Sequence, residues 1–268
     1  RLKDRLYVNL NYRFKDSTVS NSPKPGYKYM EPGLYMFPAY QDTIRSCILH
    51  SPLNPKKEYA YSDLGFILLK FAVEHVTEKS LDQYCQEEFY RKLGMYHTDF
   101  LAHKRLNKNN LVPSCVDKLY RKTELKGYVH DPVAALLGGI AGHAGLFSTA
   151  EDLAKMMQLY LNGGTYGGEY YFSPETMATF SCKNNLFPKN RRGLGFDKPE
   201  PDQTKINPVS KCLPLTSFGH TGFTGIMAWC DPDNKLLYLF LSNRTYPDEF
   251  NTKLSEMNIR TQIQDIIY

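Results

Sequence analysis

Three residues near the C-terminal end of the chain, His220-Thr221-Gly222, combine an imidazole ring, a hydroxyl and a position without a side chain. At the edge of a sheet, such a triplet could hold an anionic or carbonyl-bearing substrate against the backbone. The glycine permits close approach, the threonine supplies a hydrogen bond, and the histidine supplies a proton or a charge. A His-Thr-Gly beside a hairpin also occurs as ordinary strand and turn, so the triplet needs support from elsewhere in the chain.

A second polar group, Tyr61-Ser62-Asp63, stands directly before an apolar run with helical spacing. The apolar positions that repeat every three or four residues are Leu64, Ile67, Leu68, Phe71 and Ala72. Ser62 or Asp63 is a natural N-cap for the helix that this spacing predicts. Taken alone, Tyr61 is more consistent with an aromatic side chain packed on the core at a helix entry.

The elements that must position these groups follow from turn and cap signals. Two β-rich runs, 224–230 and 236–241, flank Asp231-Pro232-Asp233-Asn234 and predict an antiparallel hairpin. A glycine-rich bend at 138–145 leads to a predicted capping box, Ser148-Thr149-Ala150-Glu151, and a helix. Another helix is expected from Ser80 to Gly94. A strand is expected at 193–196, and a closing helix over 249–267 is expected to pack its isoleucines on the sheet.

Composition and charge are those of an ordinary globular protein. The 268 residues are 42% hydrophobic and 23% charged, enough to bury a sizeable core. No apolar run approaches the roughly 20 residues that span a bilayer. The net charge of +5 is mild and scattered, and the basic cluster at 189–192 favours a solvated loop over a nucleic-acid surface. The six cysteines contain no C-x-x-C pair, which favours free or buried thiols.

The order of elements predicts a single α+β domain without internal repeats. Residues 1–60 are expected to form an irregular lead-in with one or two short strands or helical turns. Residues 61–190 are expected to form a mainly helical subdomain, and residues 191–268 an antiparallel sheet with a closing helix. The N-terminal RLKDRLYVNL lacks an initiator Met and the apolar core of a signal peptide, which favours a mature or excised portion.

Three motifs in this order carry a family resemblance: Tyr61-Ser62-Asp63, the stretch GYVHDPVAALLGGIAGHAGLFSTAEDL, and His220-Thr221-Gly222. Together they resemble the serine β-lactamase and penicillin-binding-protein superfamily, in its class C-like esterase and D-alanyl-D-alanine carboxypeptidase branch. The sequences RRGLGFDKPEPD and SFGHTGFTG resemble those of the hydrolase domain fused behind bacterial family 3 glycosidases (β-N-acetylhexosaminidases). The resemblance covers residues 40 to 268 approximately. It implies a transpeptidase-like sheet flanked by helices, and a location in the bacterial periplasm or cell envelope.

The family's chemistry implies a role for each matching residue. Tyr61 would pass a proton from a serine nucleophile to the leaving group, with its pKa lowered by nearby cations. His220 would hold positive potential or relay a proton, and Thr221 would orient the substrate. The backbone N–H of Phe223 would form half of the oxyanion hole, an interaction worth roughly 3 kcal/mol in other hydrolases. Asp63 and Gly222 would also contact the substrate.

The chain departs from the family pattern in two places. Asp63 stands where β-lactamases place an asparagine, which would repel a nearby anion and favour esters or amine-bearing substrates. No Ser-x-x-Lys occurs among the 268 residues, whereas the family carries this nucleophile motif N-terminal to Tyr-x-Asn. We therefore expect an N-terminally incomplete domain, inactive alone, with an exposed apolar groove where the missing part packs.

Two functional classes stay open. The first is a serine hydrolase that cleaves an ester or amide of envelope material, such as a peptidoglycan peptide. The second is a catalytically inactive binding or scaffold module attached to a glycosidase.

His130-Asp131 and His143 raise the question of a metal site, but their spacing favours buried, hydrogen-bonded histidines. A small-molecule or peptide substrate is expected, without cofactor, metal, nucleic acid or transmembrane segment.

Overall fold

The computed structural model describes residues 18–56, 58–186 and 190–268. Its central element is an antiparallel sheet ordered β10-β9-β8, built from β8 (Phe218–Thr221), β9 (Met227–Asp231) and β10 (Leu236–Phe240). The predicted hairpin is confirmed as β9 and β10, which pair from Leu236 opposite Asp231 to Phe240 opposite Met227. β8 lies at the edge of this sheet and carries His220 opposite Ala228.

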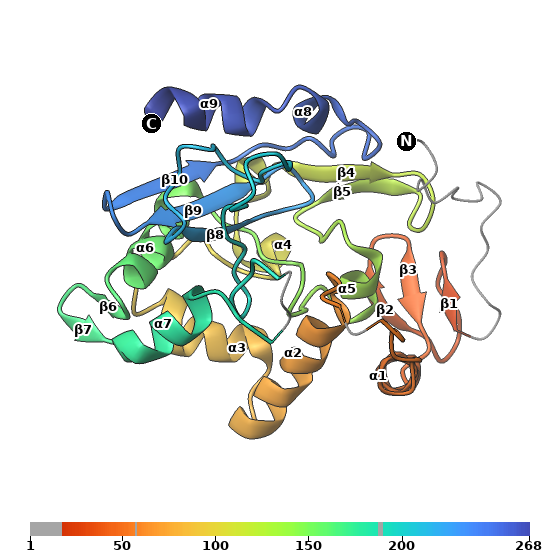
Figure 1. The fold of residues 1–268 in the computed structure, drawn as a ribbon. Coiled ribbons are helices and arrows are strands. Elements are labelled where there is room, and N and C mark those ends of the chain that lie inside the picture. The colour runs from red at the N-terminus through yellow and green to blue at the C-terminus, as the bar shows by residue number, and fades with distance from the viewer. Residues whose placement is uncertain (1–17, 57, 187–189) are drawn as a thin grey trace.

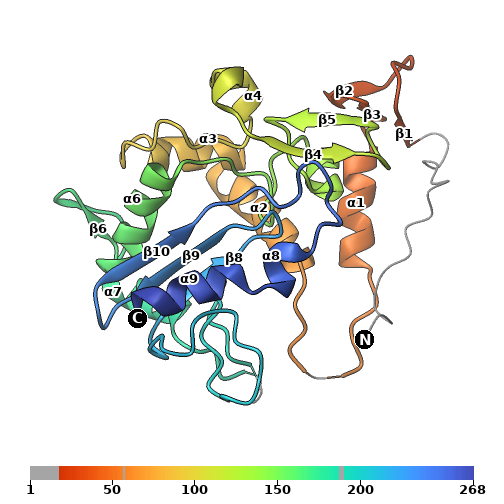
Figure 2. The same cartoon turned by 90° about the horizontal axis from the view of Figure 1, so that it is seen from above.

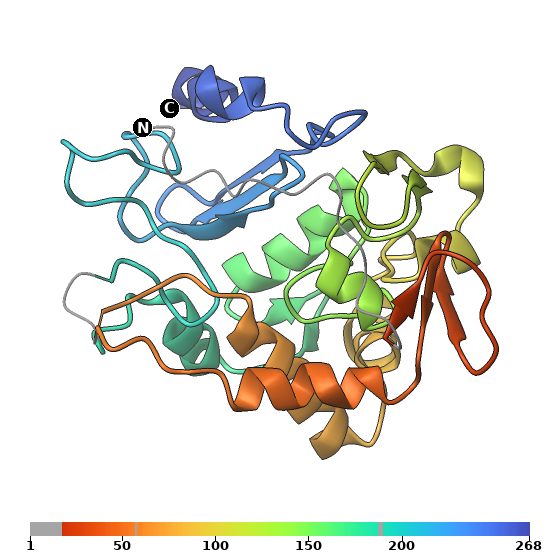
Figure 3. The same cartoon turned by 90° about the vertical axis from the view of Figure 1, so that its right-hand side faces the viewer.

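The sheet is covered by helices on both faces, as Figures 1 and 3 show. α6 (Ala150–Leu161) packs beneath β9 and β10, and α8 (Lys253–Glu256) and α9 (Ile259–Ile267) lie above. Alternate residues of β9 point to opposite faces. Met227 and Trp229 join one buried cluster, and Cys230 joins another with Met157 of α6. The predicted α+β class is therefore confirmed.

The closing helix buries a different face from the one predicted. α8 and α9 are separated at Asn258, whose φ is 50°, and both lie over the sheet (Figure 2). Thr261 and Gln264 face inward, and Gln264 Oε1 accepts a hydrogen bond from the Ser210 N–H at 2.8 Å. The 3.6-residue period then turns the isoleucines outward, so that Ile266 is 85% exposed. The expectation that the isoleucines pack on the sheet is wrong.

The helical region follows the cap signals with small shifts. Thr149 Oγ1 accepts from the Asp152 N–H, so the N-cap of α6 is Thr149 rather than Ser148. Ser148 instead bonds Thr98, so the capping box predicted at Ser148 is wrong and Thr149 caps the helix. The helix predicted after Ser80 is confirmed as α3 (Leu81–Cys85) continued by a π-helical turn, Gln86–Tyr90. The remaining elements are α2 (Leu64–Thr77), α4 (Ala102–Arg105), a 3₁₀ turn at Lys108–Asn110, β4 (Pro113–Asp117), β5 (Thr123–Lys126), α5 (Pro132–Leu136), β6 (Thr165–Tyr166), β7 (Glu169–Tyr170) and α7 (Pro174–Ser181).

The N-terminal part of the described chain is more regular than expected. It forms a small sheet of β1 (Val19–Ser20), β2 (Lys28–Glu31) and β3 (Leu34–Met36), followed by the ten-residue helix α1 (Tyr40–Leu49). Buried Arg121 anchors this sheet, because its guanidinium pairs with Glu31 of β2 and Asp117 of β4. The strands are too short to show periodicity in the sequence, and α1 buries no residue completely.

Three further expectations have an outcome in the structure. The segment 193–196 is not a strand, but a Cβ on Gly193 would lie 2.3 Å from the Phe180 carbonyl oxygen, so the expected close backbone approach is present. The six cysteines are free thiols, as favoured from their spacing. Within the described residues, the helices are too short or too polar to cross a membrane.

Candidate active site

The entry of α2 and the edge strand β8 bring Tyr61 and His220 beside each other, although most of the chain separates them. Their ring centroids are 6.1 Å apart, with the ring planes inclined by 35°. Tyr61 is 60% exposed, whereas His220 is mostly covered. The two side chains therefore share one region of the surface, although of the two Tyr61 alone lines the adjoining cavity, and their catalytic roles stay predictions.

The local structure at the start of α2 leaves the Asp63 carboxylate available to Tyr61. Asp63 occupies the N-cap position, but the Leu64 N–H is satisfied by Ser62 Oγ at 3.2 Å. The pKa of Tyr61 is raised by burial and then by the negative charge of Asp63, and the positive charge of Arg192 only partly opposes this. The expectation that cations lower the pKa of this phenol is wrong for the described chain, because burial and the Asp63 carboxylate together outweigh Arg192. Tyr61 is therefore a neutral phenol at physiological pH.

A cavity of about 510 Å³ opens beside Tyr61, between α1, the start of α2 and the start of α5. Most of its lining is apolar or weakly polar, and two carboxylates and one imidazole border it: Asp63, Asp131 and His143. Its other lining residues are Tyr40, Thr43, Ile44, Cys47, Ile48, Tyr61, Ser62, Leu64, Ile67 and Val133. A cavity thus adjoins the Tyr61 motif, and the expectation of a large exposed apolar surface where a missing segment packs stays a prediction.

Asp131 and His143 form a hydrogen-bonded pair in the wall of this cavity. His143 Nε2 lies 2.9 Å from Asp131 Oδ1, and the same carboxylate caps α5 by accepting from the Ala134 N–H at 2.7 Å. Burial raises the pKa of Asp131, but the hydrogen bonds from His143 and Ala134 outweigh it and hold this pKa below its usual value. His143 reaches the pair because Gly142 passes against α2, where a Cβ would lie 2.2 Å from the Phe66 carbonyl oxygen.

The histidines considered for a metal site are partly buried, and each is hydrogen-bonded to a carboxylate, as the spacing favoured. His143 pairs with Asp131, and His130 Nε2 lies 2.8 Å from Glu249 Oε2. Within residues 18–56, 58–186 and 190–268, no three His, Cys, Asp or Glu side chains converge on a point suited to a metal ion.

Arg192 is the residue of this site that sequence reasoning missed. Its Nη1 lies 2.7 Å from His220 Nε2, its Nη2 donates to Asp197 Oδ2 at 2.9 Å, and its guanidinium carbon is 5.0 Å from the centroid of the Tyr61 ring. The Arg192 side chain is only 17% exposed, so the solvated loop expected here is wrong for Arg192. Lys189 of that cluster lies outside the described residues.

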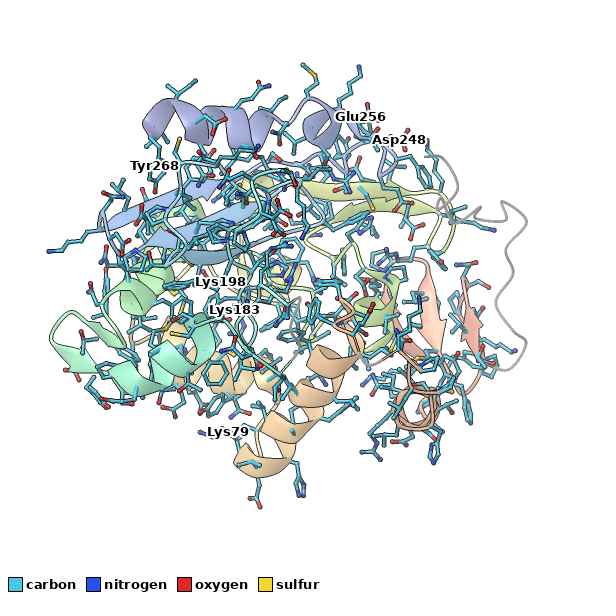
Figure 4. The ribbon with its side chains drawn as sticks, viewed as in Figure 1. Lys79, Lys183, Lys198, Asp248, Glu256 and Tyr268 are labelled. Atoms are coloured by element: carbon cyan, nitrogen blue, oxygen red, sulfur yellow. The ribbon has the colours of Figure 1, made fainter. Side chains whose placement is uncertain are left out.

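The loop that carries Arg192 is fixed to β8 by the residues that follow it. The backbone of Asp197 exchanges two hydrogen bonds with Gly219, at 2.7 and 3.1 Å, and its carboxylate also pairs with Arg191 at 2.8 Å. The adjacent Lys198 is buried between α7 and β8 (Figure 4). Its ammonium donates to the carbonyls of Ser181, Thr216 and Ser217 at 3.0–3.1 Å. Two buried charges therefore hold the loop in place, and Arg192 with it.

The remaining predicted substrate residues lie in the turn after β8. Thr221 ends the strand, and the Gly222 N–H donates to the Ile226 carbonyl at 2.7 Å. Phe223 is 63% exposed and stacks on His130 with ring centroids 5.1 Å apart. Among the described residues, the Phe223 N–H has no hydrogen-bond acceptor, as an oxyanion donor requires.

Comparisons with known proteins identify relatives of this chain. The model of the β-lactamase family matches residues 20–258 of the chain. A protein of Escherichia coli K12 named "Putative D-alanyl-D-alanine carboxypeptidase" is 35% identical over 213 residues, which are 74% of this chain and 48% of that protein. A Salmonella gallinarum protein of the same name is 31% identical over 242 residues, 82% of this chain and 54% of that protein. The chain thus spans about half the length of these relatives.

Solved structures support the fold alone. A β-lactamase from Mycobacterium bovis superposes with a TM-score of 0.52 at 21% identity, over 80% of this chain and 65% of that one. Simvastatin synthase from Aspergillus terreus superposes with a TM-score of 0.54 at 16% identity, over 91% of this chain and 66% of that one. With the family model matching most of its length, the chain belongs to the β-lactamase family.

Proposed function

We propose that this chain is part of a serine hydrolase domain that cleaves an ester or amide bond through an acyl-enzyme, with the nucleophile outside the 268 residues. The observation that carries the proposal is the placement of Tyr61 beside His220, with ring centroids 6.1 Å apart. Family membership supports the reaction class, and the two motifs that the resemblance pairs lie at one place in the fold.

Each residue has a chemical task in this proposal. Tyr61 gives its phenolic proton to the leaving group, for which a neutral phenol is the correct starting form. The lysine partner of the serine takes the serine proton and returns a proton to the phenolate. The Phe223 N–H donates to the developing oxyanion, and Thr221 orients the acyl group. Asp63 keeps the phenol protonated and receives amine-bearing or neutral groups more readily than anions.

The cavity between α1, α2 and α5 is where we place the missing segment. Ile44, Ile48 and Leu64 line it with apolar surface, and Tyr61 borders it, so that a helix packed there would bring a serine close to the phenol. Ser-x-x-Lys from an upstream segment of the same protein would then supply both the nucleophile and its lysine partner.

The substrate class and the setting are proposed from the relatives. Two relatives carry the name of a D-alanyl-D-alanine carboxypeptidase, which supports a cell-wall peptide as substrate. Such a substrate would place the protein in the bacterial periplasm or cell envelope, where fusion to a glycosidase would join two activities on one polymer. Fractionation of cells that produce the full-length protein tests this setting, and recovery in the cytosol would contradict it.

The test of function is covalent labelling of the full-length protein by a fluorescent penicillin and by a fluorophosphonate. We expect one labelled peptide, with the adduct on a serine followed three residues later by lysine. A labelled serine inside residues 1–268 would overturn the external nucleophile. Absence of labelling together with absence of ester hydrolysis would favour the alternative, a binding or scaffold module attached to a glycosidase.

A further inference from the structure

His220 is hydrogen-bonded through both ring nitrogens, and the two partners differ in kind. Its Nδ1 lies 2.7 Å from the carbonyl oxygen of Thr221, and its Nε2 lies 2.7 Å from Nη1 of Arg192. A carbonyl oxygen can only accept a hydrogen bond, and a guanidinium can only donate one. The imidazole must therefore donate through Nδ1 and accept through Nε2, which is the arrangement of a neutral ring.

We propose that Arg192 is the fixed positive charge of this active site, and that His220 serves as a neutral, tautomer-locked positioning residue between Arg192 and the substrate strand. The family resemblance left two roles open for His220, a cation or a proton relay, and the hydrogen bonds exclude the first. The assignment of charge rests on the two contacts of His220; its meaning for catalysis rests on the proposed function.

The other charges around His220 agree with this assignment. Three charged side chains face it: Arg192 in direct contact, with Asp197 and Arg191 behind. The pKa of His220 is lowered first by burial and then by Arg192, against the hydrogen bond to Thr221. Asp197 bonds both arginines, and Glu200 lies 3.8 Å from Arg191, so the second arginine has two carboxylates beside it. Among the described residues, Arg192 has one carboxylate beside it, that of Asp197.

Arg192 also connects the two halves of the site. Its guanidinium carbon lies 5.0 Å from the ring centroid of Tyr61 and 6.0 Å from that of Tyr59, distances at which a cation interacts with an aromatic ring. One side chain thus contacts the entry to α2 and the edge strand β8. Because a guanidinium stays charged at all physiological pH values, the potential felt by an anionic substrate group does not switch off as pH rises from 5 to 8.

Nitrogen-detected NMR of histidine-labelled full-length protein tests the assignment without any need for turnover. We expect His220 in the parent protein to be neutral at pH 7, with its proton on Nδ1. In Arg192→Gln, the His220 titration should move to higher pH, because a cation in contact with Nε2 has been removed. Arg191→Gln is the matched control: it removes a guanidinium from the same Asp197 but none from His220, so a much smaller shift is expected.

A second measurement compares kcat/KM for a charged and a neutral substrate. Removing a hydrogen-bonding charge costs about ten- to hundredfold in affinity, so Arg192→Gln should lose that much kcat/KM for a carboxylate-bearing ester relative to its neutral amide counterpart. Arg191→Gln should keep the parent ratio. An imidazolium at pH 7, a proton on Nε2, or equal His220 titrations in the two variants would overturn the proposal. None of these results bears on whether a serine is acylated, so the proposal and the proposed function can fail separately.

Discussion

The proton chemistry of Tyr61 is set by two charges of opposite sign. Asp63 raises the pKa of the phenol, Arg192 lowers it, and burial adds to the effect of Asp63. A carboxylate two residues away therefore adds to burial in keeping the phenol protonated, which suits Tyr61 to act as an acid.

Asp63→Asn should lower the pKa of Tyr61, because it removes the negative charge beside the hydroxyl while keeping the shape of the side chain. Carbon-13 NMR of ring-labelled tyrosine, resolved by the loss of one signal in Tyr61→Phe, measures this titration directly. Ser62→Ala changes a neutral neighbour in the same segment and should leave it unmoved. A Tyr61 titration at the same or higher pH in Asp63→Asn would contradict the role given to the carboxylate.

Sequence reasoning reached part of the site and missed the rest for a physical reason. Tyr61 and His220 belong to short motifs whose order along the chain carries information. Arg192 stands in a basic cluster that resembles a surface loop, and its contacts with Asp197 and His220 draw it inward. The spacing of His143 and Asp131 favoured hydrogen-bonded side chains over a metal site, but their pairing with each other depends on a bend of the backbone that no spacing reveals.

The strand β8 offers a contrast between two glycines at the scale of the element. A Cβ on Gly219 would lie 2.2 Å from the Ala228 carbonyl oxygen, whereas a Cβ on Gly222 would meet no described atom closer than 3.6 Å. Packing of the protein therefore requires glycine at the first position and not at the second. If Gly222 has a further requirement, it comes from the substrate.

Gly222→Ala should accordingly keep the melting temperature of the parent and reduce ester hydrolysis by the full-length protein at least tenfold, a barrier increase of about 1.4 kcal/mol. Gly219→Ala should lower the melting temperature, because the added methyl group forces β8 away from β9. Thermal denaturation and initial rates for the two variants decide the matter. Unchanged hydrolysis in Gly222→Ala would remove this residue from the substrate site.

Elements with strong local signals were predicted, and those held by distant contacts were not. The hairpin of β9 and β10 follows from turn chemistry between two β-rich runs. The small N-terminal sheet has no such signal, since its position depends on Glu31 reaching buried Arg121 from another part of the chain. The buried face of α9 was predicted wrongly because its apolar residues alone do not show that Gln264 turns inward. The Gln264 side chain accepts a hydrogen bond from the Ser210 N–H.

For the molecule as a whole, the Asp131 carboxylate links the cavity wall to stability. Its folded-state pKa lies below the usual value, so the stabilisation is present above the unfolded-state pKa of about 3.9 and is lost as pH falls through the folded-state value. Asp131→Ala removes an N-cap and should cost about 0.5–2 kcal/mol at pH 7. The difference in free energy of unfolding between the parent and Asp131→Ala should shrink in acid, where the parent carboxylate becomes protonated and loses its charge.

Denaturant unfolding of parent and Asp131→Ala at pH 7 and at pH about 3 measures this difference. Asp233→Ala, which removes an exposed carboxylate from the turn between β9 and β10, serves as the control and should stay close to the parent at both pH values. A deficit that is equal at the two pH values, or larger in acid, would show that the charge of Asp131 is not its cause.

The measurement that tests the central claim most directly is ester hydrolysis by full-length Tyr61→Phe beside Tyr59→Phe. Both tyrosines lie near Arg192, but only Tyr61 borders the cavity and faces His220. Loss of general acid–base assistance predicts a fall of roughly 10²–10⁴-fold in kcat for Tyr61→Phe, with little change in Tyr59→Phe and nearly unchanged melting temperatures in both. Full activity in Tyr61→Phe would contradict the account.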